Sequence, residues 1–373
     1  MHIEPFAVEI WMNEWETKCD WNLAETCVDS LTMGELLKLA GKSDADLSEL
    51  LPIRLGYGDI EGSDRLRKAI CSLYDSQKTE NVVVTHGTIG ANMLVHKALV
   101  AAGDRVVAVV PTYQQHYSIP ASIGADVQTL KLREENQFLP DLDALRALVT
   151  SGTRLIAINN PNNPTGALMD QSMLTEIAAI ARDAGAWILC DEVYRGTDQT
   201  GTGMTAAIAD IYEKGISTAG MSKAYALAGL RLGWIAAPRE VIEAVSIHRD
   251  YDTISVGVID DHFAALALEH RDQVLARSQS ITRGNLALLE EWLQNEPLLS
   301  WVKPQSGTTA LVKYDLPMSS KDFCVTLVRE TGVMFTPGSA FDMEGHVRIG
   351  FANDREILKE GLSRVSSFLS KHA

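Results

Sequence analysis

Short runs of β-branched and other apolar residues recur along the middle of the chain and alternate with helical patterns. Seven runs predict strands, at 81–87, 104–113, 126–132, 154–161, 186–193, 215–221 and 232–238. Several are apolar at successive positions, as in strands that helices cover on both faces. Helical patterns ending at glycine, such as 90–103 and 171–185, lie between many of them. This alternation predicts an α/β domain with a mostly parallel, mixed sheet between helices.

The pattern changes after about residue 250. A long helical region at 260–294 is followed by mixed strands near 301–315 and 345–352 and by a terminal helix. A chain of 373 residues is also long for a single core. We therefore expect a large domain at 49–250 and a smaller α+β domain at 251–373, which the amino-terminal segment 1–48 joins.

Composition and charge narrow the range of partners. The formal net charge of −16 disfavours nucleic acid and anionic membranes as partners. No stretch approaches the roughly 20 apolar residues that a membrane span requires, and the first residues do not resemble a signal peptide. Five cysteines without a C-x-x-C pair favour a reducing compartment and argue against a zinc site. We expect a cytoplasmic protein with no metal.

Polar residues gather where predicted strands end, which is where open α/β sheets bind ligands. Thr85 ends one strand, and Gly87 and Gly90 after it predict a tight turn into a helix. The amides of Thr88 and Ile89 would then be free to hold an anion at the helix start. The motif is not G-x-G-x-x-G, which disfavours a dinucleotide site.

Three later strand ends carry further candidates. Tyr113 offers a flat ring that can stack on a planar ligand. The motif "NNPNNPTG" (159–166) fixes two turns and presents Asn163, whose amide can donate to an oxygen. Asp191 ends a strand that is otherwise apolar, and Tyr194 follows it. Taken singly, each of these residues also fits an ordinary loop position.

The stretch "MSKAYALAGLRLGW" (221–234) places Ser222, Lys223 and Arg231 among small and apolar residues. A lysine at the edge of a core costs free energy unless it is neutral, paired or covalently modified.

Taken in order, these motifs resemble the class I/II aminotransferase family. They are G-T-x-G, P-x-Y, N-P-x-N-P-T-G, D-x-x-Y, S-K-A-Y-A-x-x-G-x-R-x-G-W and V-R-I-G-F. The family consists of fold type I enzymes that use pyridoxal 5′-phosphate, and the resemblance covers nearly the whole chain. It implies a large cofactor-binding domain and a smaller second domain.

The resemblance also implies roles for single residues. Lys223 would form the Schiff base with the cofactor and later act as general base. Asp191 would pair with the pyridine nitrogen, and Tyr113 would stack on the ring. Asn163 and Tyr194 would bind the phenolate oxygen, and Asn163 would also contact the substrate.

Four further features complete the implied site. Arg231, Ser222 and the turn at 87–89 would hold the phosphate. Tyr57 matches a tyrosine that reaches the phosphate in the other subunit, which implies a homodimer with shared active sites. Arg348 matches the arginine that binds the α-carboxylate of the amino acid substrate.

The amino-terminal segment resembles a branch of the family that handles guanidino amino acids. That branch includes capreomycidine synthases, arginine oxidases and a canavanine γ-lyase, and the shared pattern is W-E…N-L-A-E…G-E-L. Glu14, Glu16, Asp20 and Glu25 concentrate negative charge there, and we predict that Glu16 and Glu25 bind the substrate guanidinium. A solvated acidic face explains the same charges equally well.

The favoured hypothesis is a lyase that forms an external aldimine with a small L-amino acid, removes its α-proton and eliminates the γ-substituent of canavanine. The alternatives are an aminotransferase that uses a 2-oxo acid and, less favoured, an arginine oxidase or cyclase. Cys27 stands near a position where the oxidases have histidine, which disfavours oxidation. His86 and His116 could assist proton transfers or have no special role. A DNA-binding regulator and an NAD-dependent dehydrogenase fit the motifs poorly.

Overall fold

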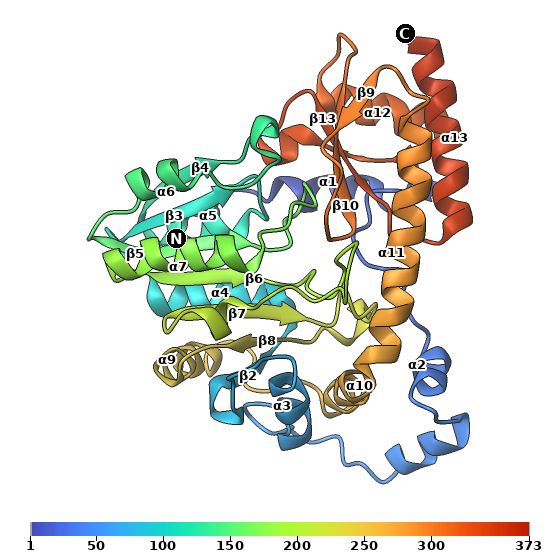
Figure 1. Cartoon of the computed structure of the whole chain (residues 1–373). Coiled ribbons are helices and arrows are strands. Elements are labelled where there is room, and N and C mark those ends of the chain that lie inside the picture. The colour runs from blue at the N-terminus through green and yellow to red at the C-terminus, as the bar shows by residue number, and fades with distance from the viewer. Residues whose placement is uncertain (1, 373) are drawn as a thin grey trace.

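A seven-stranded sheet forms the centre of a large lobe, in the order β2-β8-β7-β6-β5-β3-β4 (Figure 1). The computed structural model describes residues 2–372. Its large-lobe strands are β2 (Val82–Thr85), β3 (Arg105–Val110), β4 (Asp126–Lys131), β5 (Thr153–Asn159), β6 (Trp187–Asp191), β7 (Gly215–Gly220) and β8 (Gly233–Ala236). Only β8 runs antiparallel to its neighbours within this sheet. All seven predicted strands and the mostly parallel, mixed sheet are confirmed.

Helices cover both faces of this sheet. They are α4 (Gly87–Leu99), α5 (Gln115–Ile123), α6 (Leu142–Leu148), α7 (Gln171–Ala184), α8 (Ile208–Ile211) and α9 (Arg239–Arg249). Alternate strand residues serve opposite faces: Ile156 and Ile188 pack with α7, whereas Leu155 and Leu189 pack with α4 and α9. Two buried faces explain why these strands are apolar at successive positions.

The small lobe is a four-stranded antiparallel sheet with helices against it, in the order β12-β13-β10-β9. Its strands are β9 (Leu299–Trp301), β10 (Thr309–Tyr314), β12 (Thr336–Pro337) and β13 (His346–Gly350). Its helices are α11 (Arg271–Leu293), α12 (Ser320–Thr331) and α13 (Arg355–His372). The long helical region predicted at 260–294 consists of two helices, α10 (Val258–Glu269) and α11, which meet at His270.

The amino-terminal segment contacts both lobes. It contains α1 (Ala7–Trp15), β1 (Trp21–Asn22) and α2 (Met33–Leu39), and α3 (Asp64–Cys71) follows it after a 3₁₀ turn. Strand β1 pairs in parallel with β11 (Val333–Met334), and Trp11 and Leu23 belong to the core of the small lobe. By contrast, α2 and α10 pack with α3 in the core of the large lobe. The domain boundaries at 48 and 250 therefore stay predictions.

Short 3₁₀ turns connect several of these elements, at Asp44–Leu50, Thr79–Asn81, Glu134–Asn136, Ala228–Leu230 and Gly338–Phe341. Within residues 2–372, no helix combines the length and apolar character that crossing a membrane would require. The same residues contain no group of three His, Cys, Asp or Glu side chains placed to hold a metal ion.

Candidate active site

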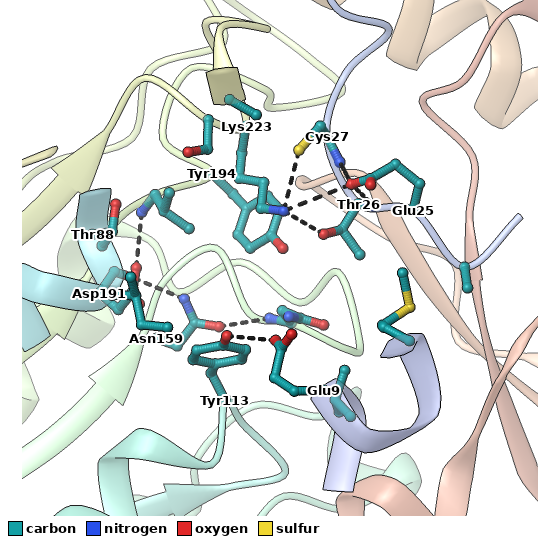
Figure 2. A pocket seen from close by; sticks show the side chains of 18 of the residues that line it. Glu9, Glu25, Thr26, Cys27, Thr88, Tyr113, Asn159, Asp191, Tyr194 and Lys223 are labelled. Atoms are coloured by element: carbon teal, nitrogen blue, oxygen red, sulfur yellow. Dashed lines mark hydrogen bonds and ion pairs between the residues drawn. The ribbon is translucent and has the colours of Figure 1, made fainter. Parts of the chain in front are cut away.

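A cavity of about 340 Å³ lies where the carboxyl ends of the central strands meet the amino-terminal segment and the small lobe. Figure 2 shows that Lys223, Asp191 and Tyr113 all face this space from the large lobe. Glu9 and residues 24–27 face it from the amino-terminal segment. Parallel strands bring their carboxyl ends to one edge of a sheet, which is why residues far apart in sequence converge here.

Lys223 follows β7 and reaches the opposite wall. Its Nζ donates to Thr26 Oγ1 at 2.6 Å and lies 3.3 Å from Cys27 Sγ and 3.9 Å from Glu25 Oε1. Burial by itself lowers the pKa of Lys223, but Cys27, Tyr194 and Glu25 outweigh it and leave the pKa raised. Burial raises the pKa of the Cys27 thiol to about 11. Without a cofactor, the Lys223 amine is therefore a cation paired with Glu25. This pairing offsets the free-energy cost of burying a lysine.

Asp191 is fixed by groups behind the pocket. Its Oδ1 accepts the backbone N–H of Val193 at 3.1 Å, and its Oδ2 accepts the Asn92 amide at 2.7 Å. Asn92 is itself oriented by Thr218, whose hydroxyl donates to Asn92 Oδ1 at 2.7 Å. His116 Nε2 lies 3.7 Å from Asp191 Oδ2 and makes no hydrogen bond among the described residues. Two hydrogen-bond donors hold this carboxylate at the pocket edge.

The start of α4 forms a cradle with Arg231. The helix begins at Gly87, whose φ is +68°, and a Cβ there would lie 3.1 Å from Arg231 Nη2. The hydroxyl of Thr88 is buried and finds no partner within residues 2–372. Gly90 lies inside the helix with no left-handed φ, so the prediction that it forms the turn is wrong. A helix start, a guanidinium and an unpartnered hydroxyl together suit a phosphate group.

Arg348, on β13, is buried with one polar atom unpartnered. Its Nη1 donates to Asn163 Oδ1 at 3.2 Å, and its Nη2 donates to Ala24 O at 3.0 Å and Thr336 Oγ1 at 3.1 Å. Its side chain is 3% exposed, and its Nε has no partner among the described residues. Since Asn163 Oδ1 is engaged by Arg348, the amide nitrogen of Asn163 is left to donate into the pocket. This arrangement suits a ligand carboxylate.

Two tyrosines form part of the pocket wall. The Tyr113 hydroxyl donates to Glu9 Oε1 at 2.8 Å, and its ring is tilted by 53° against Phe6 at a centroid distance of 4.6 Å. Tyr194 is 2% exposed. Burial raises the pKa of Tyr194, whereas the charges of Lys223 and Arg348 partly oppose that rise. Both phenols are therefore neutral donors near pH 7.

Acidic side chains line the side of the pocket that the amino-terminal segment provides. Glu25 Oε1 accepts the backbone N–H groups of Thr26 and Cys27 at 2.6 and 2.7 Å. Burial opposes the ionisation of Glu25, but Lys223 and these two amides outweigh it, so its pKa is lowered. Glu16 also lines the cavity, and its pKa is raised by burial and by the charges of Glu25 and Glu9.

The structure also places the remaining predicted residues. Ser222 and Ile89 line the same cavity. Tyr57 is 84% exposed and is not among the residues that line the cavity of its own chain. His86 precedes α4 and faces a separate, mainly apolar hollow. The roles predicted for these residues stay predictions.

Sequence reasoning missed Glu9, Asn92 and Thr26. Asn92 gave one signal, because it is a polar residue on the inward face of a mostly apolar helical run. Glu9 and Thr26 gave none, since their contacts join residues 104 and 197 positions apart.

Comparison with known proteins agrees with this geometry. Residues 33–365 match the family model for aminotransferase class I and II. The chain is 31% identical over 367 residues to capreomycidine synthase from Streptomyces vinaceus, which covers 98% of this chain and 94% of that protein.

Two solved structures are similar over nearly their whole length. A PLP-dependent aminotransferase from Streptococcus suis 89-1591 has a TM-score of 0.97 and 42% identity, with 100% of this chain and 99% of that chain covered. The PLP-dependent cyclase OrfR has a TM-score of 0.92 and 28% identity, again with 100% and 99% coverage. The protein thus belongs to the class I and II aminotransferase family and is a pyridoxal 5′-phosphate-dependent enzyme of fold type I.

Proposed function

We propose that this enzyme is a lyase that eliminates the guanidinooxy group of canavanine or a close analogue. The observation that supports this most is the opposite charge at two sides of one pocket. Arg348 offers an unpartnered, buried guanidinium nitrogen, whereas Glu9 and Glu16 form no ion pair with a basic side chain among the described residues. A ligand with a carboxylate at one end and a cation at the other would satisfy both.

The residues at the strand ends fit pyridoxal 5′-phosphate. Lys223 would carry it as an imine, Asp191 would hold its ring nitrogen protonated, and the cradle of Thr88 and Arg231 would bind its phosphate. Tyr113 would stack on the ring. When bound, this cofactor supplies an electron sink that makes the α-hydrogen of an amino acid acidic.

Further residues would position the cofactor and substrate. Asn163 and Tyr194 would donate to the phenolate oxygen, and Ser222 and the amide of Ile89 would add to the phosphate site. The donor set matches the group, because the unpartnered atoms in the pocket are hydroxyl and guanidinium donors that suit anionic oxygens.

A homodimer with shared active sites is part of the proposal. Leu51, Leu55 and Tyr57 are 84%, 81% and 84% exposed, although they are large apolar or aromatic side chains on one short segment. A second copy that covers this segment would remove them from water and could bring Tyr57 to the partner's phosphate site.

The chain's own residues explain how a proton would move. Arg348 would hold the substrate carboxylate and thereby orient Cα toward Lys223. Lys223, released from the cofactor as a neutral amine, would take the α-proton, and the Thr26 hydroxyl would hold that amine in reach. General bases placed in this way contribute about 10²- to 10⁴-fold to a rate.

The charge of the pocket also bears on the type of reaction. Glu9 and Glu16 would repel the distal carboxylate of 2-oxoglutarate, which disfavours a general glutamate-dependent aminotransferase. In canavanine the guanidino group is joined to Cγ through oxygen. Removal of the α-proton and then of a β-proton can therefore break the Cγ–O bond. The oxygen leaves with the bonding pair and takes up one proton as hydroxyguanidine, the other proton returns to carbon, and an unsaturated four-carbon amino acid remains. Similarity to capreomycidine synthase, from the guanidino amino acid branch, supports this choice.

The decisive experiment is to incubate the holoenzyme with canavanine alone. The proposal predicts that hydroxyguanidine is released over many turnovers with no 2-oxo acid added. A single half-turnover that stops until a 2-oxo acid is supplied would instead establish an aminotransferase. That is the second candidate, because the Streptococcus suis neighbour carries that description.

A further inference from the structure

We propose that Glu9 is the receptor for the cationic distal group of the substrate, and that Tyr113 holds Glu9 in the receiving position. This inference deepens the proposed function and rests on it. It assigns specificity to a residue of α1 that the sequence did not indicate, and it gives Tyr113 a second task besides stacking.

Only one of the two carboxylate oxygens of Glu9 is hydrogen-bonded among the described residues. Tyr113 Oη donates to its Oε1 at 2.8 Å, and no hydrogen bond within residues 2–372 reaches its Oε2 (Figure 2). Helix α1 is tied to both lobes, since Ala7 N donates to Gln114 Oε1 at 2.9 Å and Trp11 Nε1 donates to Phe335 O at 2.8 Å. A carboxylate fixed at one oxygen and open at the other is prepared to receive a donor.

The other two carboxylates on the amino-terminal side of the pocket, Glu25 and Glu16, are less suited to bind a cationic group. Glu25 already accepts two backbone N–H groups and lies 3.9 Å from the Lys223 amine, so its charge serves that amine. Glu16 is largely exposed and only partly buried, and its carboxylate makes no hydrogen bond among the described residues that would fix it. Glu9 is therefore the carboxylate that combines fixation with an open oxygen.

The mutual repulsion of Glu9, Glu16 and Glu25 indicates that the ligand brings a positive charge. The pKa of Glu16 is raised by burial and also by the negative charges of Glu25 and Glu9, so all three act on one shared space. A cation placed there would relieve that repulsion. Independently, Arg348 is 3% exposed, has an unpartnered Nε and lines the same cavity, which indicates a ligand carboxylate. A dipolar amino acid with a guanidinium or ammonium at its far end meets both requirements.

The test uses the holoenzyme and a matched pair of ligands, arginine and citrulline. They have nearly the same shape, but the distal group of citrulline is neutral. Dissociation constants would be measured from the change in visible absorption on ligand binding. For the wild type we expect arginine to bind at least 10-fold more tightly than citrulline.

Glu9→Gln should weaken arginine about 10- to 100-fold and change citrulline less than about 3-fold, since a hydrogen bond to a charged group is lost. Glu9→Asp should restore part of the preference. Glu14→Gln, an exposed residue of the same helix that does not line the cavity, is the matched control and should behave as wild type.

Tyr113→Phe keeps the ring and removes the hydroxyl that fixes Glu9. It should reduce the preference for arginine by about 3- to 10-fold, and in the Glu9→Gln background it should have no further effect on that preference. Additive effects would overturn the positioning role of Tyr113. Circular dichroism and the cofactor absorption band would show that each variant is folded and loaded.

The outcomes separate the two proposals. A wild type that prefers arginine and a Glu9→Gln variant that does not would support the inference. A Glu9→Gln variant that keeps the full preference would overturn the role of Glu9 and leave the proposed function standing. A wild type that binds citrulline as tightly as arginine would overturn both.

Discussion

The two sides of the pocket are built in different ways. The first side, here called the cofactor floor, consists of Asp191, Asn163, Lys223 and Arg231 from the large lobe. The second, here called the amino-terminal wall, is formed by residues 8–27. The floor follows mainly from strand register, because Asp191 ends β6 and Asn163 and Lys223 follow the ends of β5 and β7, whereas Arg231 lies just before β8. The wall depends on contacts between segments far apart in the chain, such as Glu9 with Tyr113.

This difference separates chemistry from selectivity. The floor carries the groups that suit the cofactor shared across the family. Under the proposed function, Glu9 on the wall would distinguish one amino acid side chain from another. Changes to the floor should therefore lower the rate for every substrate, and changes to Glu9 on the wall should alter the ratio between substrates. Thr26 and Glu25 belong to the wall but contact Lys223, so they should affect the rate as well.

The largest expected effect comes from the floor. Lys223→Ala should lower turnover by at least about 10⁴-fold and abolish covalent attachment of the cofactor by borohydride. Lys214→Ala is the matched control, since this lysine precedes the other end of β7 and donates to Gly185 O. Mass spectrometry of reduced peptides measures the attachment. A Lys223→Ala protein that is still labelled elsewhere would contradict the assignment.

A moderate effect on kcat is expected from Asn92, which lies behind the cofactor floor and holds Asp191. Asn92→Ala removes the 2.7 Å hydrogen bond to Asp191 and should lower kcat about 10- to 100-fold for cationic and neutral substrates alike. It should also shift the pH at which the visible band of the cofactor changes. Thr218→Val, which leaves Asn92 in place but removes its orienting hydroxyl, should act in the same direction more weakly. An unchanged pH titration in Asn92→Ala would refute the positioning role.

The smallest effect concerns stability rather than activity. Burial, opposed in part by Arg195, raises the pKa of Glu192 to about 7, and Glu192 Oε1 accepts from Ile208 N and Ser217 Oγ at 2.8 and 2.7 Å. Because its folded pKa lies above its unfolded value, the folded state binds an extra proton between about pH 4.5 and 7. Stability from this group should fall as pH rises through that window and stay constant above it.

Glu192→Gln should remove this contribution to the pH dependence of the unfolding free energy. The contribution corresponds to about one proton, a slope of ~1.4 kcal/mol per pH unit. Denaturant unfolding of both proteins at pH 5, 6, 7 and 8 measures it. Parallel curves for wild type and variant would show that Glu192 does not titrate as stated.

The same division explains what the sequence could predict. Strand ends are local features, so the sequence alone places Asp191, Asn163 and Lys223 at one edge of the sheet. The turn at Gly90 was wrong because the helix already begins at Gly87, where the left-handed φ is needed. The break at His270 falls in the polar run 269–273, within the long helical region that the sequence predicts.

The wall was predictable only as a concentration of charge. Glu16 and Glu25 were identified as acids that face the pocket, and both line it. Which oxygen is free depends on tertiary contacts, since Glu25 is engaged by the N–H groups of Thr26 and Cys27 and Glu9 depends on Tyr113. No periodicity in the sequence encodes these contacts.

The most direct test of the separation between floor and wall is exchange of the substrate α-hydrogen with deuterated water, followed by NMR. Arginine and citrulline would be compared in wild type and Glu9→Gln across a range of concentrations. The account predicts that Glu9→Gln raises KM for arginine alone and leaves the exchange rate at saturation within about 3-fold for both. Equal loss of the saturated rate for both ligands would contradict it, because the wall would then be part of the chemistry.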